Sequence, residues 1–151
     1  MREPIVLHGR KVVGGVTEGP ALVTHQAISG WGGVNARTGT IIETRHELRG
    51  QSFAGRVLVF PGAKGSSGWS GVFHTARLAG TAPKAFIFNR MSTKMALGAV
   101  VTGVPAITDL DRDPLEVIET GDWVRVDADR GIVEVFKRDP EALPSEASHL
   151  S

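Results

Sequence analysis

The chain has 151 residues, of which 41% are hydrophobic and 22% charged, and its formal net charge is +1. This length fits one compact domain, and the composition is typical of a soluble globular protein. Because the chain has no cysteine, it has no disulfide, no thiol nucleophile and no cysteine-bound zinc or iron–sulfur centre. No apolar run is long enough for a membrane span, and the N-terminal apolar stretch is too short for a signal peptide, so we expect a cytoplasmic location.

The charges are unevenly distributed along the chain. Residues 1–108 contain 12 Lys and Arg against 4 Asp and Glu, whereas residues 109–151 contain 5 against 12. Either the two parts neutralise each other across the surface, or the basic part creates a positive field around an anionic ligand. Nucleic acid is not expected as that ligand, because the basic residues are scattered singly and no stripe combines them with aromatic residues.

The first 55 residues predict short strands separated by turns. Two strands are expected within residues 11–29, one around Val12, Val13 and Val16 and one over residues 21–23, joined by a turn at Gly19-Pro20. The glycine-rich residues 30–40 predict a loop. Residues 40–44 (TIIET) then predict a short strand, and residues 46–55 another connection.

The centre of the chain predicts a parallel sheet with crossover helices. Residues 56–60 (RVLVF) form a continuous apolar run that is typical of a buried strand. The apolar residues from Trp69 to Ala79 recur at steps of three and four, which indicates a helix that ends at Gly80. A strand over residues 84–89, a helix over 92–103 that begins at Ser92 and a strand over 104–108 complete a βαβαβ unit with right-handed crossovers.

The C-terminal part predicts a hairpin and a tail. Residues 123–126 (WVRV) and 132–136 (IVEVF) alternate around a turn at 127–131 (DADRG). We expect one domain over residues 1–139 and a frayed polar tail over 140–151. The predicted fold class is α/β, with the central βαβαβ unit flanked by further β-strands.

One loop, residues 60–71 (FPGAKGSSGWSG), lies between the first buried strand and the first helix. The carboxyl end of a parallel strand is a common place for a ligand, so a simple linker is not expected. A Walker phosphate loop does not fit, because the order is Lys64-Gly65-Ser66 and Phe60 occupies the position of the first glycine. A nucleophile elbow does not fit either, because neither Ser66 nor Ser67 has glycine at both flanking positions.

Two interpretations of this loop remain open. In the first it binds an anion: Gly65 lets the backbone approach a ligand, while Lys64 and the positive N-terminus of the following helix favour a carboxylate or an alkoxide. In the second, Ser66 or Ser67 merely caps that helix, a contribution of about 1 kcal/mol.

Two glycine-rich motifs carry a resemblance to a known family: ISGWGGVNARTG (28–39) and VFPGAKGSSGWSG (59–71). Together with APKAFIFN (82–89) and ALGAVVTGVPAITD (96–109), they resemble the small subunit of aconitase X over about residues 10 to 136. The resemblance implies the swivelling β/β/α domain of the aconitase superfamily. It also implies a partner, the aconitase X large subunit, whose own cysteines hold an iron–sulfur cluster, so that this chain binds no metal.

The resemblance further implies a hydro-lyase that dehydrates a small anionic hydroxy acid. Bacterial members act on cis-3-hydroxy-L-proline and archaeal members on 5-phosphomevalonate. We expect the first substrate, because Trp31 and Trp69 lie near the expected site and suit a flat heterocycle, and we keep phosphomevalonate as the alternative. A noncatalytic binding module also remains open. A phosphohistidine swivel domain, which the C-terminal hairpin resembles, is not expected because its Gly-Gly-x-Thr-Ser-His loop is missing.

By the family pattern, Ser66 is the catalytic base. As an alkoxide it removes the proton next to the substrate carboxylate, while iron in the partner acts as a Lewis acid on the leaving hydroxyl. Lys64 is expected to clamp a substrate carboxylate, with Gly65 and Ser67 also binding substrate. In aconitases an arginine follows Gly-Ser-Ser, but here Gly68 and Trp69 follow, so no arginine role is transferred to this loop.

The other motif suggests a second substrate-facing loop formed by Ser29, Trp31, Gly32 and Gly33. The alternative is a tight turn with Trp31 packed in the core or against the partner. His46 lies between Arg45 and Arg49, and a lone histidine in such a place is expected to be a surface or structural residue.

Overall fold

A computed structural model describes residues 3–30, 32–64 and 68–138 of the chain. Most of the strands join one eight-stranded sheet, and two further pairs of short strands lie beside it. In chain order the elements are β1 (Ile5–His8), β2 (Arg10–Val13), β3 (Val16–Val23), β4 (Ile28–Ser29), β5 (Val34–Asn35), β6 (Thr40–Ile41), β7 (Val57–Phe60), β8 (Ala63–Lys64), α1 (Trp69–Ala79), β9 (Ala85–Phe88), α2 (Thr93–Thr102), β10 (Ala106–Thr108), α3 (Pro114–Val117), β11 (Trp123–Asp127) and β12 (Ile132–Phe136).

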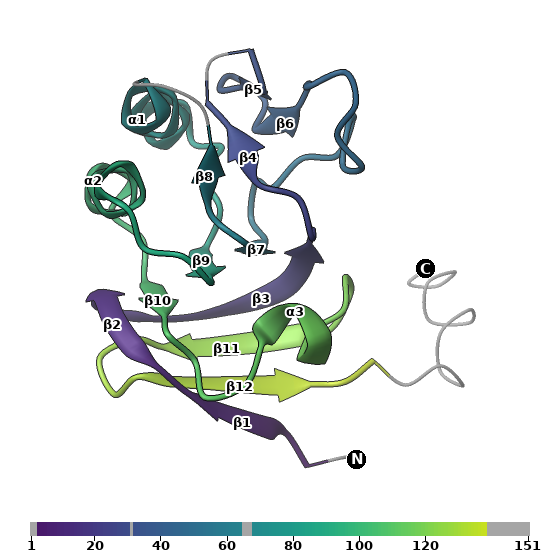
Figure 1. The fold of residues 1–151 in the computed structure, drawn as a ribbon, viewed down its shortest axis with the longest axis vertical. Helices are drawn as coiled ribbons and strands as arrows, with labels where there is room; N and C mark the ends of the chain where they lie inside the picture. Colours follow the sequence, from purple (N-terminus) through teal and green to yellow (C-terminus); the bar gives the residue numbers. More distant parts are fainter. Residues whose placement is uncertain (1–2, 31, 65–67, 139–151) are drawn as a thin grey trace.

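The large sheet is mixed, with the strand order β1-β12-β11-β3-β7-β9-β10-β2 (Figure 1). The neighbours β3, β7, β9 and β10 run parallel, whereas β1, β12 and β11 at one end and β2 at the other are antiparallel to their neighbours. Strand β3 connects the two parts. Its residues Val16–Pro20 pair with β11, and Ala21–Val23 pair with β7.

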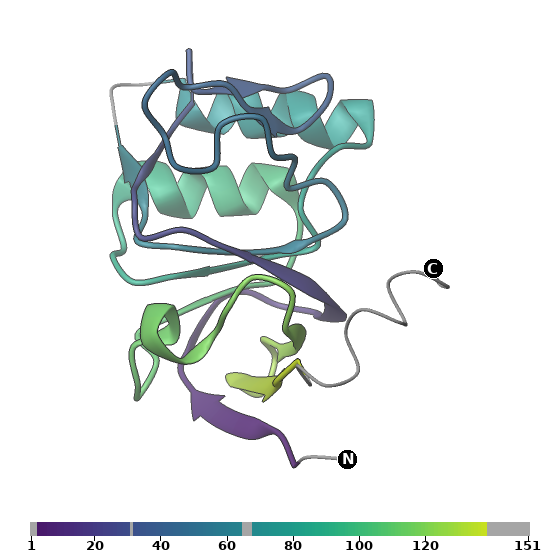
Figure 2. The ribbon, with the colours of Figure 1, turned by 90° about the vertical axis from the view of Figure 1, so that its right-hand side faces the viewer.

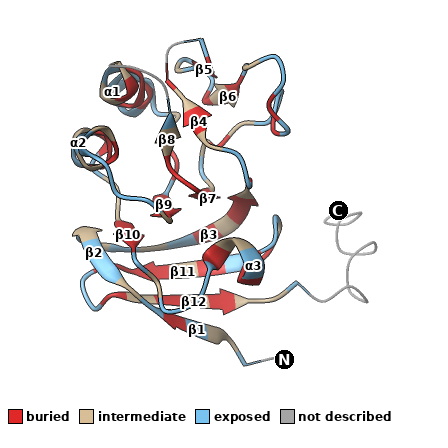
Figure 3. Ribbon diagram, in the orientation of Figure 1, coloured by how far each residue is buried: buried red, intermediate tan, exposed pale blue. Residues whose placement is uncertain are grey.

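The parallel strands are buried on both faces, which explains their continuous apolar sequences. Side chains alternate across a strand, so Leu58 and Phe60 join one hydrophobic core while Val57 and Val59 join the other. All four are completely buried, and Figure 3 shows this burial along β7, β9 and β10. A parallel sheet covered on both faces is the usual arrangement.

Different elements of the structure cover the two faces of the sheet. Helices α1 and α2 lie side by side over one face (Figures 1 and 2), and the core beneath them contains Trp69, Phe73, Met95 and Ala99. The second core lies toward the antiparallel strands and α3, and includes residues of β1, β11 and β12. The structure therefore has the predicted mixed α/β architecture, with a central βαβαβ unit and flanking strands.

The helices begin and end where the sequence predicts. Gly80 and Gly103 follow α1 and α2 in the left-handed conformation, with φ of 79° and 72°, a conformation that glycine adopts without steric cost. Ser92 caps α2, since its Oγ accepts a hydrogen bond from the backbone N–H of Met95. The hairpin β11–β12 is also confirmed.

The predicted turn at Gly19-Pro20 is wrong. Both residues lie inside β3. The break in the chain instead lies at Gly14-Gly15, where Gly15 has a φ of +125°, so the predicted strand around Val12, Val13 and Val16 is divided between β2 and β3. Pro20 has no N–H for a strand ladder, and it is the last residue of β3 that pairs with β11 before the strand joins β7. The proline therefore marks a change of partner rather than a reversal of the chain.

Several short elements have no clear signal in the sequence. They are β1, α3, β5 and the two strands of the small sheet β4–β8. The predicted strand at 40–44 is limited to Thr40–Ile41. The predicted tail at 140–151 lies outside the described residues. Within the described ranges, no helix is long and apolar enough to cross a membrane.

Candidate active site

The parallel strands bring several connecting segments to one edge of the sheet. The segments that follow β3, β7, β9 and β10 begin at Thr24, Pro61, Asn89 and Asp109. Carboxyl ends of parallel strands lie at the same edge, which is where ligands bind in open α/β sheets. Both glycine-rich motifs continue from this edge.

The two motifs are joined directly through β4 and β8. These two short strands pair in parallel, with Ile28 opposite Ala63 and Ser29 opposite Lys64. The N–H of Ile28 donates to the carbonyl of Gly62 at 3.2 Å. Two of the predicted site residues, Ser29 and Lys64, are thereby brought next to each other although 35 positions separate them in the chain.

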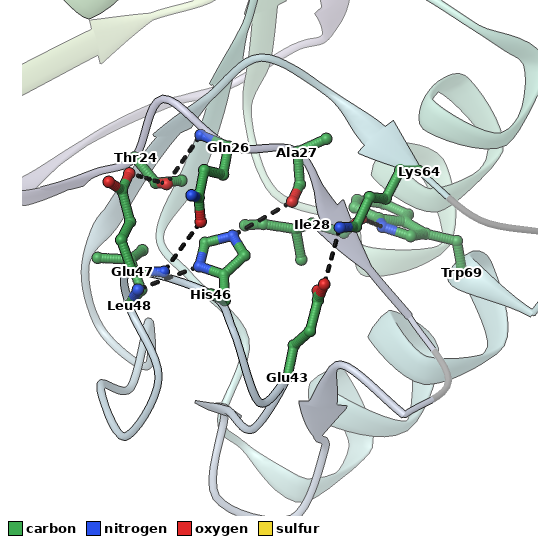
Figure 4. A network of polar contacts seen from close by, with 10 residues as sticks. All are labelled: Thr24, Gln26, Ala27, Ile28, Glu43, His46, Glu47, Leu48, Lys64 and Trp69. Carbon is green, nitrogen blue, oxygen red and sulfur yellow. Dashed lines mark hydrogen bonds and ion pairs between the residues drawn. The ribbon is translucent and has the colours of Figure 1, made fainter.

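Trp69 holds the first motif against helix α1. Its side chain is 1% exposed and stacks on Phe73 with ring centroids 4.2 Å apart. Its Nε1–H donates to the carbonyl of Ile28 at 2.9 Å (Figure 4). A Cβ at Gly30 would lie 2.8 Å from the Cα of Trp69, so only glycine permits this approach. Trp69 is thus a core residue, and the expectation that it suits a flat substrate ring is not met.

The chain turns tightly after Ser29. The N–H groups of Gly33 and Val34 both donate to the carbonyl of Gly30 at 3.1 Å. Gly32 has a φ of +80°, and a Cβ at Gly33 would lie 2.6 Å from the carbonyl oxygen of Ser29. The chain therefore turns tightly at these glycines, whereas their contact with substrate stays a prediction, and the packing of Trp31 lies outside the described residues.

Lys64 has a partner that the sequence did not indicate. Its Nζ lies 2.7 Å from Oε2 of Glu43 (Figure 4), and the two side chains are 45% and 27% exposed. The other carboxylate oxygen, Oε1, is buried and has no hydrogen-bond partner among the described residues. Glu43 follows β6 with no motif around it, so only the fold reveals that it faces the second glycine-rich motif.

A hydrogen-bond network ties residues 46–48 to the segment before β4 (Figure 4). The carboxylate of Glu47 accepts from the Thr24 hydroxyl and, at 2.8 Å, from the N–H of His25. These bonds lower the pKa of Glu47, the Thr24 hydroxyl contributing most. In return the N–H of Glu47 donates to Oε1 of Gln26 at 2.9 Å. The network therefore fixes the backbone of residues 24–26, which leads into β4 and Ser29.

His46 is part of this support. It is 5% exposed, its Nδ1 accepts from the N–H of Leu48 at 3.0 Å, and its Nε2 lies 3.2 Å from the carbonyl of Ala27. Since a backbone N–H donates to Nδ1, the ring proton is on Nε2 and donates to Ala27. Both nitrogens are used by the backbone, which confirms the structural interpretation of His46.

Helix α1 begins directly after Gly68, which occupies its N-cap position in the left-handed conformation with φ of 105°. Glycine has no side chain that could cap the helix, so among the described residues no side chain serves as the N-cap. Ser66 and Ser67, the predicted capping residues, lie outside the described residues. The backbone N–H groups at this helix end carry a partial positive charge beside the loop.

A cavity of about 230 Å³ opens between β8 and the start of α2. Its charged lining residues are Lys64 and Arg90. Arg90 follows β9 at the same edge of the sheet as Lys64, a position that marks it as a candidate binding residue. Its lining among the described residues is Ala27, Gly62, Ala63, Lys64, Arg90, Met91 and Ser92.

Four predicted site residues, Trp31, Gly65, Ser66 and Ser67, lie outside the described residues. Across the described part of the chain, no group of three or more His, Asp or Glu side chains is placed to hold a metal ion. Together with the absence of cysteine, this provides no set of ligands for an iron–sulfur cluster.

Comparison with known proteins gives a consistent family. Residues 6–135 match the model of the aconitase X swivel domain. The phosphomevalonate dehydratase small subunits of Methanocella arvoryzae and Thermococcus gammatolerans are 43% and 42% identical, over 85% and 86% of this chain and 98% and 97% of theirs. The crystal structure of Thermococcus kodakaraensis aconitase X in its holo form superposes with a TM-score of 0.83 at 40% identity, covering 88% of this chain and 99% of that one. With its sequence and its fold in agreement, this chain belongs to the aconitase X swivel domain family.

Proposed function

We propose that this chain is the small subunit of a phosphomevalonate dehydratase and that it acts with a large partner subunit. The observation that carries the proposal is similarity over nearly the full length of two small subunits of that name. The similarity covers 98% of one of these relatives. We therefore expect this chain to take the same part in a two-subunit enzyme as that relative does.

The choice of substrate differs from the first expectation, cis-3-hydroxy-L-proline. The relatives named above support the alternative, phosphomevalonate. In addition, the argument for a flat heterocycle depended on two tryptophans, and Trp69 is buried in the core. The remaining support for a ring-shaped substrate is therefore weak compared with the support from the relatives.

The iron–sulfur cluster implied by the family does not fit the residues of this chain. The chain has no cysteine, and its described residues offer no group of three metal ligands. We therefore assign the cluster to the large subunit.

The reaction removes water from a hydroxy acid. The carbon next to the carboxylate loses a proton, and the electron pair of the broken C–H bond forms the double bond. The hydroxyl leaves the neighbouring carbon with the electron pair of the C–O bond, takes up a proton and is released as water. In this proposal the Ser66 oxygen accepts the proton. The positive N-terminal end of α1 lowers the cost of a negatively charged oxygen in this loop.

The test is turnover by the reconstituted two-subunit enzyme. Purified complex is given 5-phosphomevalonate and, separately, cis-3-hydroxy-L-proline, and the unsaturated products are quantified. We expect product from phosphomevalonate. Turnover of hydroxyproline alone would reject this substrate assignment.

A further inference from the structure

We propose that Arg90 binds the phosphate group of the substrate, in the cavity between β8 and the start of α2. This inference rests on the proposed function, since it assigns one end of that substrate to a place in the fold. Three observations support it: the backbone hydrogen bonds that hold the walls of the cavity, the positive charge of its lining, and the position of one lining residue, Lys64, two residues before the predicted base.

The walls of the cavity are held together by the backbone. The N–H groups of Asn89 and Arg90 both donate to the carbonyl of Pro61, at 3.2 and 2.9 Å. The segment after β9 is thereby fixed against the segment after β7, and β8 continues from the latter. The volume of the cavity, about 230 Å³, is several times the roughly 30 Å³ that one water molecule occupies. A phosphate group with a short chain therefore fits.

The free charge in the cavity belongs to Arg90. Lys64 is neutralised by Glu43 at 2.7 Å, whereas no ion pair or side-chain hydrogen bond joins the exposed Arg90 guanidinium to another described residue. Among the residues that the structure describes, no acidic side chain lines the cavity. An unpaired guanidinium that borders a recess presents the planar set of donors that binds a phosphate in a bidentate manner.

Helix α2 adds to the positive potential. It is 10 residues long, Ser92 at its N-terminus lines the cavity, and its first turn contains no acidic residue. The partial positive charge of this helix end is therefore not offset by a carboxylate on its own first turn. The helix end supports the anion that Arg90 binds.

A second cavity at the same edge provides a useful comparison. It measures about 340 Å³ and is lined by Arg112 together with Asp109 and Asp113. Two carboxylates against one guanidinium disfavour a dianionic phosphate. Of the two recesses, the one beside Lys64 therefore suits the phosphate.

The lining of the cavity also suits the reaction. Lys64, which lines it together with Arg90, precedes the predicted base Ser66 by two positions in the sequence. In this proposal the phosphate at Arg90 is the end of the substrate that does not react.

Variants of the reconstituted two-subunit enzyme test the inference. We expect Arg90→Ala to raise the KM for phosphomevalonate by about 10- to 100-fold, with a smaller change in kcat, because a charge-assisted hydrogen bond to an ionised group is lost. Arg90→Lys should recover part of the loss, since it keeps the charge but not the planar donors. Arg112→Ala, in the second cavity, is the matched control and should leave KM unchanged.

A second measurement separates this inference from the proposed function. Inorganic phosphate is titrated into the wild-type and Arg90→Ala complexes by calorimetry. If wild type does not turn over phosphomevalonate but Arg90→Ala weakens phosphate binding about tenfold or more, the proposed function fails while the anion subsite stands. If wild type is active and Arg90→Ala changes neither KM nor phosphate binding, the inference is overturned. A rise in KM for Arg112→Ala but not for Arg90→Ala also overturns it and assigns the phosphate to the second cavity.

Discussion

Lys64 and Glu43 form an ion pair with 2.7 Å between Nζ and Oε2. The pair joins the segment after β6 to strand β8, and β8 is paired with β4. Lys64 is thereby held at a defined position directly before the loop that contains the predicted base. A flexible lysine in this place would lose more conformational freedom when it met a substrate.

The Glu43→Gln variant tests this positioning role. The ion pair is partly exposed, so its loss should change the free energy of unfolding by less than about 1 kcal/mol. We expect the kcat/KM of the reconstituted enzyme to fall roughly tenfold, because Lys64 is no longer held in place. Urea unfolding and steady-state kinetics measure the two effects. The control is Glu116→Gln, at an exposed position of α3. Equal activity of the two variants would contradict the role of Glu43 in positioning Lys64.

The Ser66→Ala variant tests the proposed base. Removal of a general base should lower kcat by about 100- to 10,000-fold, while the variant still assembles with the large subunit. Ser70→Ala, in the first turn of α1, is the control that changes the same atoms nearby. Full activity of the assembled Ser66→Ala enzyme would instead favour a noncatalytic binding module.

The packing around Trp69 predicts opposite effects for two glycine substitutions. A Cβ at Gly98 of α2 would lie 2.3 Å from the Trp69 ring, whereas a Cβ at Gly71 of α1 meets nothing within 4 Å. Gly98→Ala should therefore destabilise the chain by about 1–3 kcal/mol through overpacking. Gly71→Ala should be neutral or stabilising by up to about 1 kcal/mol, since alanine favours a helix more than glycine does. Urea denaturation followed by circular dichroism gives both values, and equal midpoints would disprove this account of the packing.

The network around Glu47 predicts a dependence of stability on pH. Hydrogen bonds from the Thr24 hydroxyl, and then from the N–H of His25, lower the pKa of Glu47 in the folded chain. Its contribution to stability is therefore complete above the ordinary glutamate value of about 4.3 and is lost as the pH falls through the lower pKa of the folded state.

The variant Glu47→Gln should remove this dependence. We expect it to be less stable than wild type at neutral pH and to approach wild type as the pH falls below 4, which urea midpoints over an acid series measure. A difference between the two proteins that stays constant over the series would show that Glu47 does not contribute through its charge.

The sequence indicates the regular elements well and the site only in part. Helices α1 and α2 and strands β7, β9 and β10 are predicted because apolar periodicity and end signals such as Ser92 and Gly80 are local properties. The turn at Gly19-Pro20 is wrong because local turn signals take no account of a strand that changes its partner. Glu43 and Arg90 are not singled out, since neither belongs to a motif.

What the sequence determines by itself is the alternation of apolar and polar residues, the helix boundaries, the lack of cysteine and the two glycine-rich motifs that lead to the family. The tertiary structure alone decides that Ser29 lies opposite Lys64, that Glu43 holds that lysine, and that the Arg90 side chain borders the same cavity without a partner in the described part of the chain. The physical reason is that each of these contacts joins segments more than 20 positions apart. Such contacts depend on the pairing of strands and the closure of the sheet edge, for which no local pattern of residues provides a signal.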